Sequence, residues 1–202
     1  ILKRVVDSES LEKFLAAKYP GAKRFGLEGG ESLVPLLDTV IEELGSKGAK
    51  ELVMGMSHRG RLNVLINVMG KKPSELFTEF DEDFEQDDAH TGDVKYHLGY
   101  SSNILTSGGQ VHVALGSNPS HLEVVNSVVL GSVRARQDRR QDSSMTKVVP
   151  ILMHGDASFS AQGIVMEILQ LSQTRAFGVG GTIHAVSYTH LSCRRARSCR
   201  SR

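Results

Sequence analysis

Polar residues of a particular kind follow each of three short apolar segments in this chain. Residues 57–61 after Met56 contain Ser, His and two Arg, including Arg61, and residues 116–121 after Leu115 contain Asn, His and two Ser. Residues 154–158 after Met153 contain His, Asp and Ser. Arg binds phosphate or carboxylate, and Asp binds a divalent cation that bridges phosphates. Together these segments predict a binding site for an anionic ligand.

For these polar segments to meet, the apolar runs before them must be neighbouring strands of one sheet. The runs at 52–56, 111–115 and 148–153 are typical of short buried strands, and helical patterns lie between them. This alternation predicts an α/β fold with a mainly parallel sheet flanked by helices. In such sheets, ligands bind beyond the carboxyl ends of the strands.

Apolar periodicity predicts the helices that would cover this sheet. A first helix is expected behind an N-cap at Ser8 or Ser10, and a second is expected over 32–44 with Gly45 at its C-cap position. Further helices are expected over 62–69, 73–80, 119–133 and 162–171. The residues from His90 to Gln110 show no period and predict a long loop.

Composition and charge exclude several classes of protein. The chain has 202 residues, 40% of them hydrophobic, and no apolar run approaches the ~18 residues of a membrane span. Its net charge is +1, but five Arg and both Cys lie in residues 185–202. Residues 1–184 are therefore mildly acidic and free of cysteine, which disfavours nucleic-acid binding and excludes cysteine chemistry there.

Other common motifs are missing from the sequence. The chain has no P-loop, no G-x-S-x-G, no H-E-x-x-H and no G-x-G-x-x-G after a strand. The acidic run from Glu79 to Asp88 does not fit an EF-hand, because Gln86 and Gly92 stand where that loop needs Gly and Glu. This run is interpreted as a solvated loop.

Five segments in fixed order give a more specific signal. They are residues 24–32 (RFGLEGGES), 56–65 (MSHRGRLNVL), 92–99 (GDVKYHLG), 118–123 (NPSHLE) and 154–157 (HGDA). This series resembles the thiamine-diphosphate-dependent first, decarboxylating component of the 2-oxoglutarate dehydrogenase complex. The resemblance implies a thiamine-diphosphate-binding fold. Residues 1–30 would form an N-terminal helix and connector, and residues 31–184 an incomplete cofactor-binding domain that carries the diphosphate-binding module.

The resemblance also implies an activity. Such an enzyme decarboxylates 2-oxoglutarate oxidatively in the tricarboxylic acid cycle, using thiamine diphosphate and Mg²⁺. It passes the succinyl group to a lipoyl group of dihydrolipoyl succinyltransferase, in a complex that also holds dihydrolipoyl dehydrogenase. A homodimer is expected for the full-length parent, in the bacterial cytoplasm or, in a eukaryote, the mitochondrial matrix.

Two alternatives stay open on the sequence. One is a sister enzyme acting on 2-oxoadipate, because one methylene discriminates substrates by only ~1–3 kcal/mol. The other is a non-catalytic module that binds thiamine diphosphate. The joint presence of His58, Arg59, His97 and Asp156 argues against the module.

The resemblance assigns roles residue by residue. His58 and His97 would recognise the substrate carboxylate and assist proton transfers, for which histidine is suited near neutral pH. The expected cofactor-binding residues are Arg59, Ser120, Leu122, Asp156 and Ala157. Among them Asp156 would be the Mg²⁺ ligand, Arg59 would approach the diphosphate, and Ala157 would contact the cofactor through its backbone. Three other histidines are given supporting roles: His112 in a strand, His121 in a loop and His154 directly before the Gly-Asp turn.

The chain also departs from this family near its end. The family continues a Gly-Gly-Thr-Ile-His segment, here residues 180–184, into an Asn pair that completes the Mg²⁺ site, whereas this chain has no Asn after Asn126. Residues 186–191 resemble translated cloning or sequencing linker, and we interpret residues 185–202 as a non-native tail. Without the pyrimidine-binding module, the 202-residue chain by itself is expected to be inactive.

Overall fold

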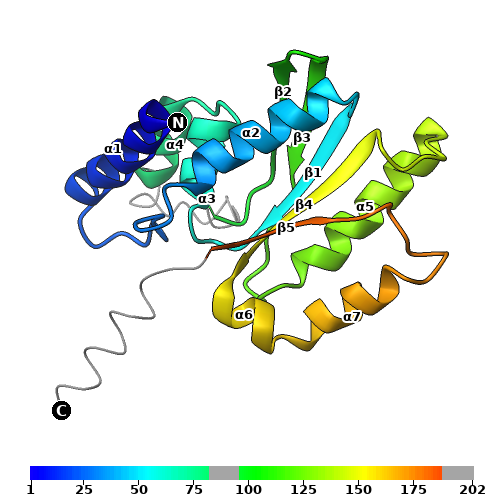
Figure 1. Ribbon diagram of the computed structural model, residues 1–202. Coiled ribbons are helices and arrows are strands. Elements are labelled where there is room, and N and C mark those ends of the chain that lie inside the picture. The colour runs from blue at the N-terminus through cyan, green and yellow to red at the C-terminus, as the bar shows by residue number, and fades with distance from the viewer. Residues whose placement is uncertain (82–95, 188–202) are drawn as a thin grey trace, which may run out of the picture.

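The computed structural model describes residues 1–81 and 96–187, and within them it forms one five-stranded sheet (Figure 1). The strands are β1 (Glu51–Met56), β2 (Tyr100–Thr106), β3 (Gly109–Leu115), β4 (Val148–Gly155) and β5 (Ile183–Ser187). Their order is β2-β3-β1-β4-β5, with only the β2–β3 pair antiparallel. The predicted α/β class, the mainly parallel sheet and all three expected strands are confirmed.

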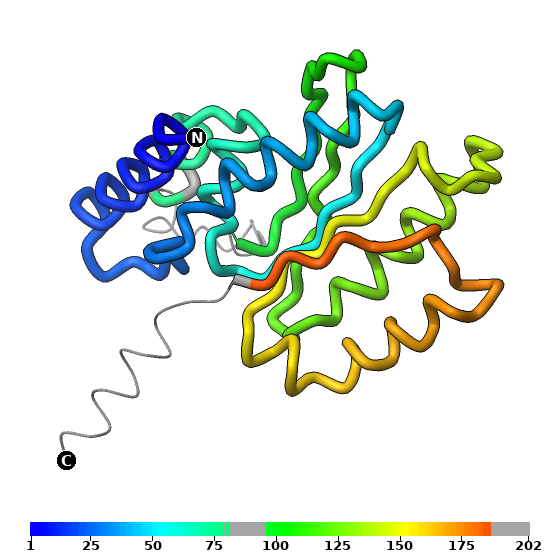
Figure 2. The backbone as a smooth tube through the Cα atoms, viewed as in Figure 1, coloured from blue at the N-terminus to red at the C-terminus, as the bar shows by residue number. Residues whose placement is uncertain are grey.

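The register of the strands brings the predicted polar segments to one edge of the sheet. Met54 pairs with both Leu115 and Ile151, and Met56 pairs with Met153. β5 runs parallel to β4, and Figure 2 shows its orange-to-red tube beside the yellow tube of β4. Four parallel strands therefore end at the same carboxyl edge.

Helices cover both faces of the sheet (Figure 1). They are α1 (Leu2–Lys18), α2 (Leu33–Ser46), α3 (Arg61–Asn63), the π-helical turn η1 (Val64–Val68), α4 (Pro73–Asp81), α5 (Val125–Arg140), α6 (Asp156–Ala161) and α7 (Gly163–Leu171). Alternate β1 residues separate the two faces: Leu52 and Met54 pack in a core with α1, α2, α4 and η1, whereas Val53 packs with α5 and α7. None of the described helices has both the length and the apolarity that a membrane span requires.

The first helix differs from its prediction. α1 begins at Leu2 rather than behind Ser8 or Ser10, and Ser8 is buried within it. The side chain of Arg4 donates to both Asp38 of α2 and the carbonyl of Asn67. These contacts hold the extra turns against the rest of the molecule.

Gly45 does not cap the second helix. It lies inside α2, whose C-cap is Lys47. A Cβ on Gly45 would lie 2.3 Å from Thr106 Oγ1, so this glycine serves the close approach of α2 to the β2–β3 hairpin.

The prediction of a long loop from His90 to Gln110 is wrong from Tyr100 onward, where the chain forms strands. Residues 90–95 of this predicted loop lie outside the described residues, and so do residues 82–88 of the acidic run. Residues 100–105 alternate half-buried with exposed and Thr106 is buried, as expected for an edge strand with one covered face. The helix expected over 119–133 begins only at Val125, because residues 122–124 form a turn. The other expected helices are present, with a π-helical turn in the 62–69 segment and an unexpected α6 before α7.

Candidate functional site

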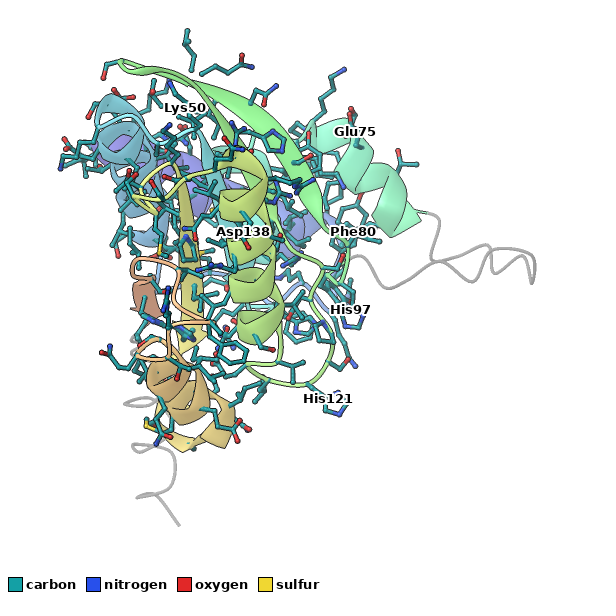
Figure 3. All side chains as sticks on the ribbon, turned by 90° about the vertical axis from the view of Figure 1, so that its right-hand side faces the viewer. Lys50, Glu75, Phe80, His97, His121 and Asp138 are labelled. Atoms are coloured by element: carbon teal, nitrogen blue, oxygen red, sulfur yellow. The ribbon has the colours of Figure 1, made fainter. Side chains whose placement is uncertain are left out.

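The carboxyl edge of the sheet carries the candidate site. In Figure 3, His97 and His121 lie toward one end of the molecule, and Lys50, which immediately precedes β1, lies at the opposite end. Two groups of polar side chains gather at the histidine end, one around His58 and His97 and one around Glu123 and His154.

His58 and His97 face each other although 39 positions separate them in the chain. Their ring centroids are 5.0 Å apart and the ring planes are inclined by 62°. Asn118 Nδ2 lies 3.3 Å from His58 Nδ1, and Ser120 Oγ lies 3.2 Å from His97 Nε2. The structure thus brings together the predicted residues His58, His97 and Ser120, and it adds Asn118, one of the polar residues after Leu115 that had no individual role.

Two aromatic rings border the histidine pair. The rings of Phe25 and Tyr96 lie 5.0 and 5.8 Å from that of His58. Phe25 comes from the connector between α1 and α2 and has a left-handed φ of 44°, a sterically costly conformation for this residue type. The connector therefore forms one wall of the site.

The surroundings of His58 favour its neutral form. Burial lowers the pKa of His58, and the nearby His97 and Arg61 lower it further. An Asn118 Nδ2 donor requires His58 Nδ1 to accept, so the neutral ring carries its proton on Nε2. His58 can then donate this proton to a ligand carboxylate.

Arg61 is fully buried, and its charge acts on His58. Its Nη2 donates to the carbonyls of Leu98 (2.6 Å) and Gly116 (2.7 Å), while Nε and Nη1 have no hydrogen-bond partner among the described residues. Burial lowers the pKa of Arg61 to about 10, so the guanidinium stays charged at neutral pH. Sequence reasoning placed Arg61 among the polar strand-end residues but gave it no role.

Arg59 lies at the connector. Its Nη1 donates to the carbonyl of Gly26 at 3.1 Å. Its expected approach to a diphosphate stays a prediction.

The second group centres on Glu123. Its carboxylate accepts hydrogen bonds from His154 Nδ1 (2.6 Å), Ser158 Oγ (2.6 Å) and Asn126 Nδ2 (2.8 Å). His154 Nε2 lies 2.9 Å from His184 Nδ1 of β5. Burial alone would raise the pKa of Glu123, but the hydrogen bonds from His154, Ser158 and Asn126 outweigh it and lower the pKa. Glu123 is therefore ionised at neutral pH.

A narrow pocket joins the two groups. Its lining includes Ser57, His58, Asn118, His121, Leu122 and Glu123. The predicted residue Leu122 is 51% exposed and contributes to this lining, and its role in the cofactor pocket stays a prediction.

Asp156 and Ala157 begin α6 directly after β4, at the same edge. Asp156 Oδ1 accepts a hydrogen bond from the Ala157 amide at 2.8 Å. Within the described part of the chain, no three His, Cys, Asp or Glu side chains are grouped closely enough to hold a metal by themselves. Mg²⁺ commonly takes one or two carboxylates together with phosphate oxygens and water, so a single Asp156 fits a metal that arrives with a diphosphate.

His112 and the first residues of the predicted tail both lie in strands of the sheet. His112 Nδ1 lies 2.9 Å from Asn103 Oδ1 across the β2–β3 pair. Ala185, Val186 and Ser187, placed by sequence in a non-native tail, continue β5 in register with β4, and the rest of that tail lies outside the described residues.

The sequence is similar to that of a known enzyme component. A family model described as "Dehydrogenase E1 component" matches residues 3–188. Proteins named 2-oxoglutarate dehydrogenase E1 component from Azotobacter vinelandii and Cupriavidus necator are 60% and 55% identical to this chain over 186 residues. The protein of that name from Haemophilus influenzae is 49% identical over 185 residues. Each match covers 92% of this chain, which spans about a fifth (20%) of the length of these relatives.

Proposed function

This chain belongs to the dehydrogenase E1 component family, and from that premise we propose that it is part of an enzyme that oxidatively decarboxylates 2-oxoglutarate. The names of relatives up to 60% identical support this reaction. The enzyme would transfer the succinyl group to a lipoyl group of a partner succinyltransferase, within a complex that includes dihydrolipoyl dehydrogenase. A homodimer in the bacterial cytoplasm is proposed as the working form of the whole protein.

The observation that carries this proposal is the His58–His97 pair at the edge that also holds Asp156. A 2-oxo dicarboxylate needs donors for its carboxylates, and Mg²⁺ needs a carboxylate oxygen. These two kinds of group serve different parts of one reaction and meet at one sheet edge. A protein that only held a diphosphate would not need the histidine pair.

Thiamine diphosphate, when bound, supplies the electron sink for loss of CO₂ from a 2-oxo acid. We propose that Asp156 ligates the accompanying Mg²⁺ and that the Ala157 backbone contacts the cofactor. Arg59 would approach the diphosphate, and Ser120 and Leu122 would line the cofactor pocket. Residues 31–184 would then form part of the cofactor-binding domain, with residues 1–30 as helix and connector.

The histidine pair would act on the substrate itself. His58 would donate from Nε2 to the substrate carboxylate, because Asn118 occupies its Nδ1. Ser120 orients His97 through Nε2 and so sets the direction of the ring. The charge of the buried Arg61 would favour a bound anion nearby.

Calorimetry on the full-length protein that contains this segment tests the proposal. Wild type should bind thiamine diphosphate in the presence of Mg²⁺, and Asp156→Asn should weaken that binding about 10-fold or more. Asp138→Asn is the matched control, since Asp138 is an exposed α5 residue that pairs with Arg134. Failure of the wild type to bind the cofactor, or equal losses in both variants, would overturn the proposal.

A further inference from the structure

The most heavily hydrogen-bonded carboxylate at this edge belongs to Glu123, which has no role in the proposed function. It lies in the turn that leads from β3 to α5, and it is 8% exposed. Its φ of 66° is left-handed, a conformation that residues with a side chain adopt only where their surroundings compensate for it. Three side-chain hydrogen bonds provide that compensation here.

Two of these bonds reach across to the segment that carries Asp156, one to the end of β4 and one to α6. The His154 ring belongs to β4, two positions before Asp156, and Ser158 lies two positions after it. Each donates to a different carboxylate oxygen of Glu123, at 2.6 Å in both cases. The carboxylate thus holds the chain on both sides of Asp156.

The contacts around Glu123 and His154 extend to the neighbouring strand, β5. Because an ionised carboxylate only accepts hydrogen bonds, His154 must carry a proton on Nδ1. Its ring stacks on that of His184 of β5, with centroids 5.1 Å apart, and Phe159 packs against the ring at 4.8 Å. The ring of His154 is therefore fixed by contacts from three elements besides its own strand: the turn before α5, α6 and β5.

We propose that Glu123 is a positioning residue that holds residues 154–158, and with them Asp156, in the orientation that binds the magnesium diphosphate. This inference rests on the proposed function for the identity of that ligand. It assigns Glu123 no contact with substrate or cofactor. Groups that orient a metal ligand in this way commonly change metal affinity about 10- to 100-fold when they are removed.

The test compares three variants of the full-length protein by calorimetry with thiamine diphosphate and Mg²⁺. Glu123→Ala should weaken binding about 10- to 100-fold. Glu123→Gln should stay within about threefold of wild type, because a glutamine can accept from His154 and donate to the Ser158 hydroxyl. Glu51→Ala is the matched control, since Glu51 is 9% exposed and pairs with Arg136 and Arg140 at the other edge of the sheet.

Hydrogen exchange without cofactor provides the second readout. Peptides covering residues 155–161 should exchange faster in Glu123→Ala than in wild type. Their exchange rate should be unchanged in Glu51→Ala. Unaltered exchange and affinity in Glu123→Ala, or equal losses in Glu51→Ala, would overturn the positioning role.

Two further outcomes are also decisive. If Glu123→Ala does not fold, Ser158→Ala replaces it, and wild-type affinity and exchange in that variant would overturn the inference. If the wild type binds no thiamine diphosphate, the proposed function fails, and the exchange comparison alone then decides whether Glu123 positions this segment.

Discussion

The imidazole rings of His58 and His97 meet at 5.0 Å, one from the turn after β1 and the other from the segment before β2. Neither ring is held by its own segment alone. Asn118 and Ser120, both from the turn after β3, contact His58 and His97 respectively. Three stretches of chain thus converge on one pair of bases, because β1 and β3 end, and the antiparallel β2 begins, at the same edge of the sheet.

The histidines of the site predict how stability depends on pH. Burial, followed by neighbouring charge, lowers the pKa of both His58 and His184 in the folded chain. Between these lowered values and 6.5, the unfolded chain binds more protons than the folded chain, so the free energy of unfolding should rise with pH. It should be fully restored above about pH 6.5 and fall as the pH drops below that value.

Urea unfolding of the chain at pH 7.5 and 5.5 measures this dependence. The double variant His58→Gln/His184→Gln should show a smaller loss between the two pH values than wild type. Greater stability at pH 5.5, or an identical loss in the double variant, would contradict the assignment of these two groups.

Two helical glycines predict opposite effects of the same substitution. Gly131→Ala in α5 should stabilise the chain by about 0.5–1 kcal/mol, because alanine favours a helix and nothing lies within 4 Å of the added Cβ. Gly45→Ala in α2 should instead destabilise it by about 1–3 kcal/mol, because the Cβ would overlap Thr106. The midpoints of urea unfolding should move in opposite directions, and a midpoint for Gly45→Ala at or above that of wild type would refute the close packing of α2 on the hairpin.

The sheet and its carboxyl edge could be predicted because β1 and β4 are buried along most or all of their length, which produces continuous apolar runs. β2 could not be recognised in this way, since every second residue of this edge strand is exposed. The start of α5 was placed too early because the helical apolar spacing extends back through the turn at 122–124.

Prediction of the candidate site from the sequence has the same limit as prediction of the fold. His58, His97 and Asp156 stand in motifs that carry their own signal. Glu123 stands in one of those motifs as well, but its importance depends on His154 and Ser158, which lie 31 and 35 positions further along the chain. No local pattern reports a contact of that separation, so only the fold could identify it.

We propose that the full-length protein containing this chain decarboxylates 2-oxoglutarate with the help of the His58–His97 pair at this edge of the sheet. Release of CO₂ from 2-oxoglutarate by the full-length protein, with an artificial electron acceptor, tests it most directly. Wild type should release CO₂ only when thiamine diphosphate and Mg²⁺ are both present. His97→Ala should lower kcat/KM by about 10²- to 10⁴-fold while still binding the cofactor. The control variant His112→Ala should have the kcat/KM of wild type, because His112 lies on β3 beside Asn103. The proposal would be contradicted if His97→Ala released CO₂ as efficiently as wild type, or if wild-type protein with cofactor bound released none.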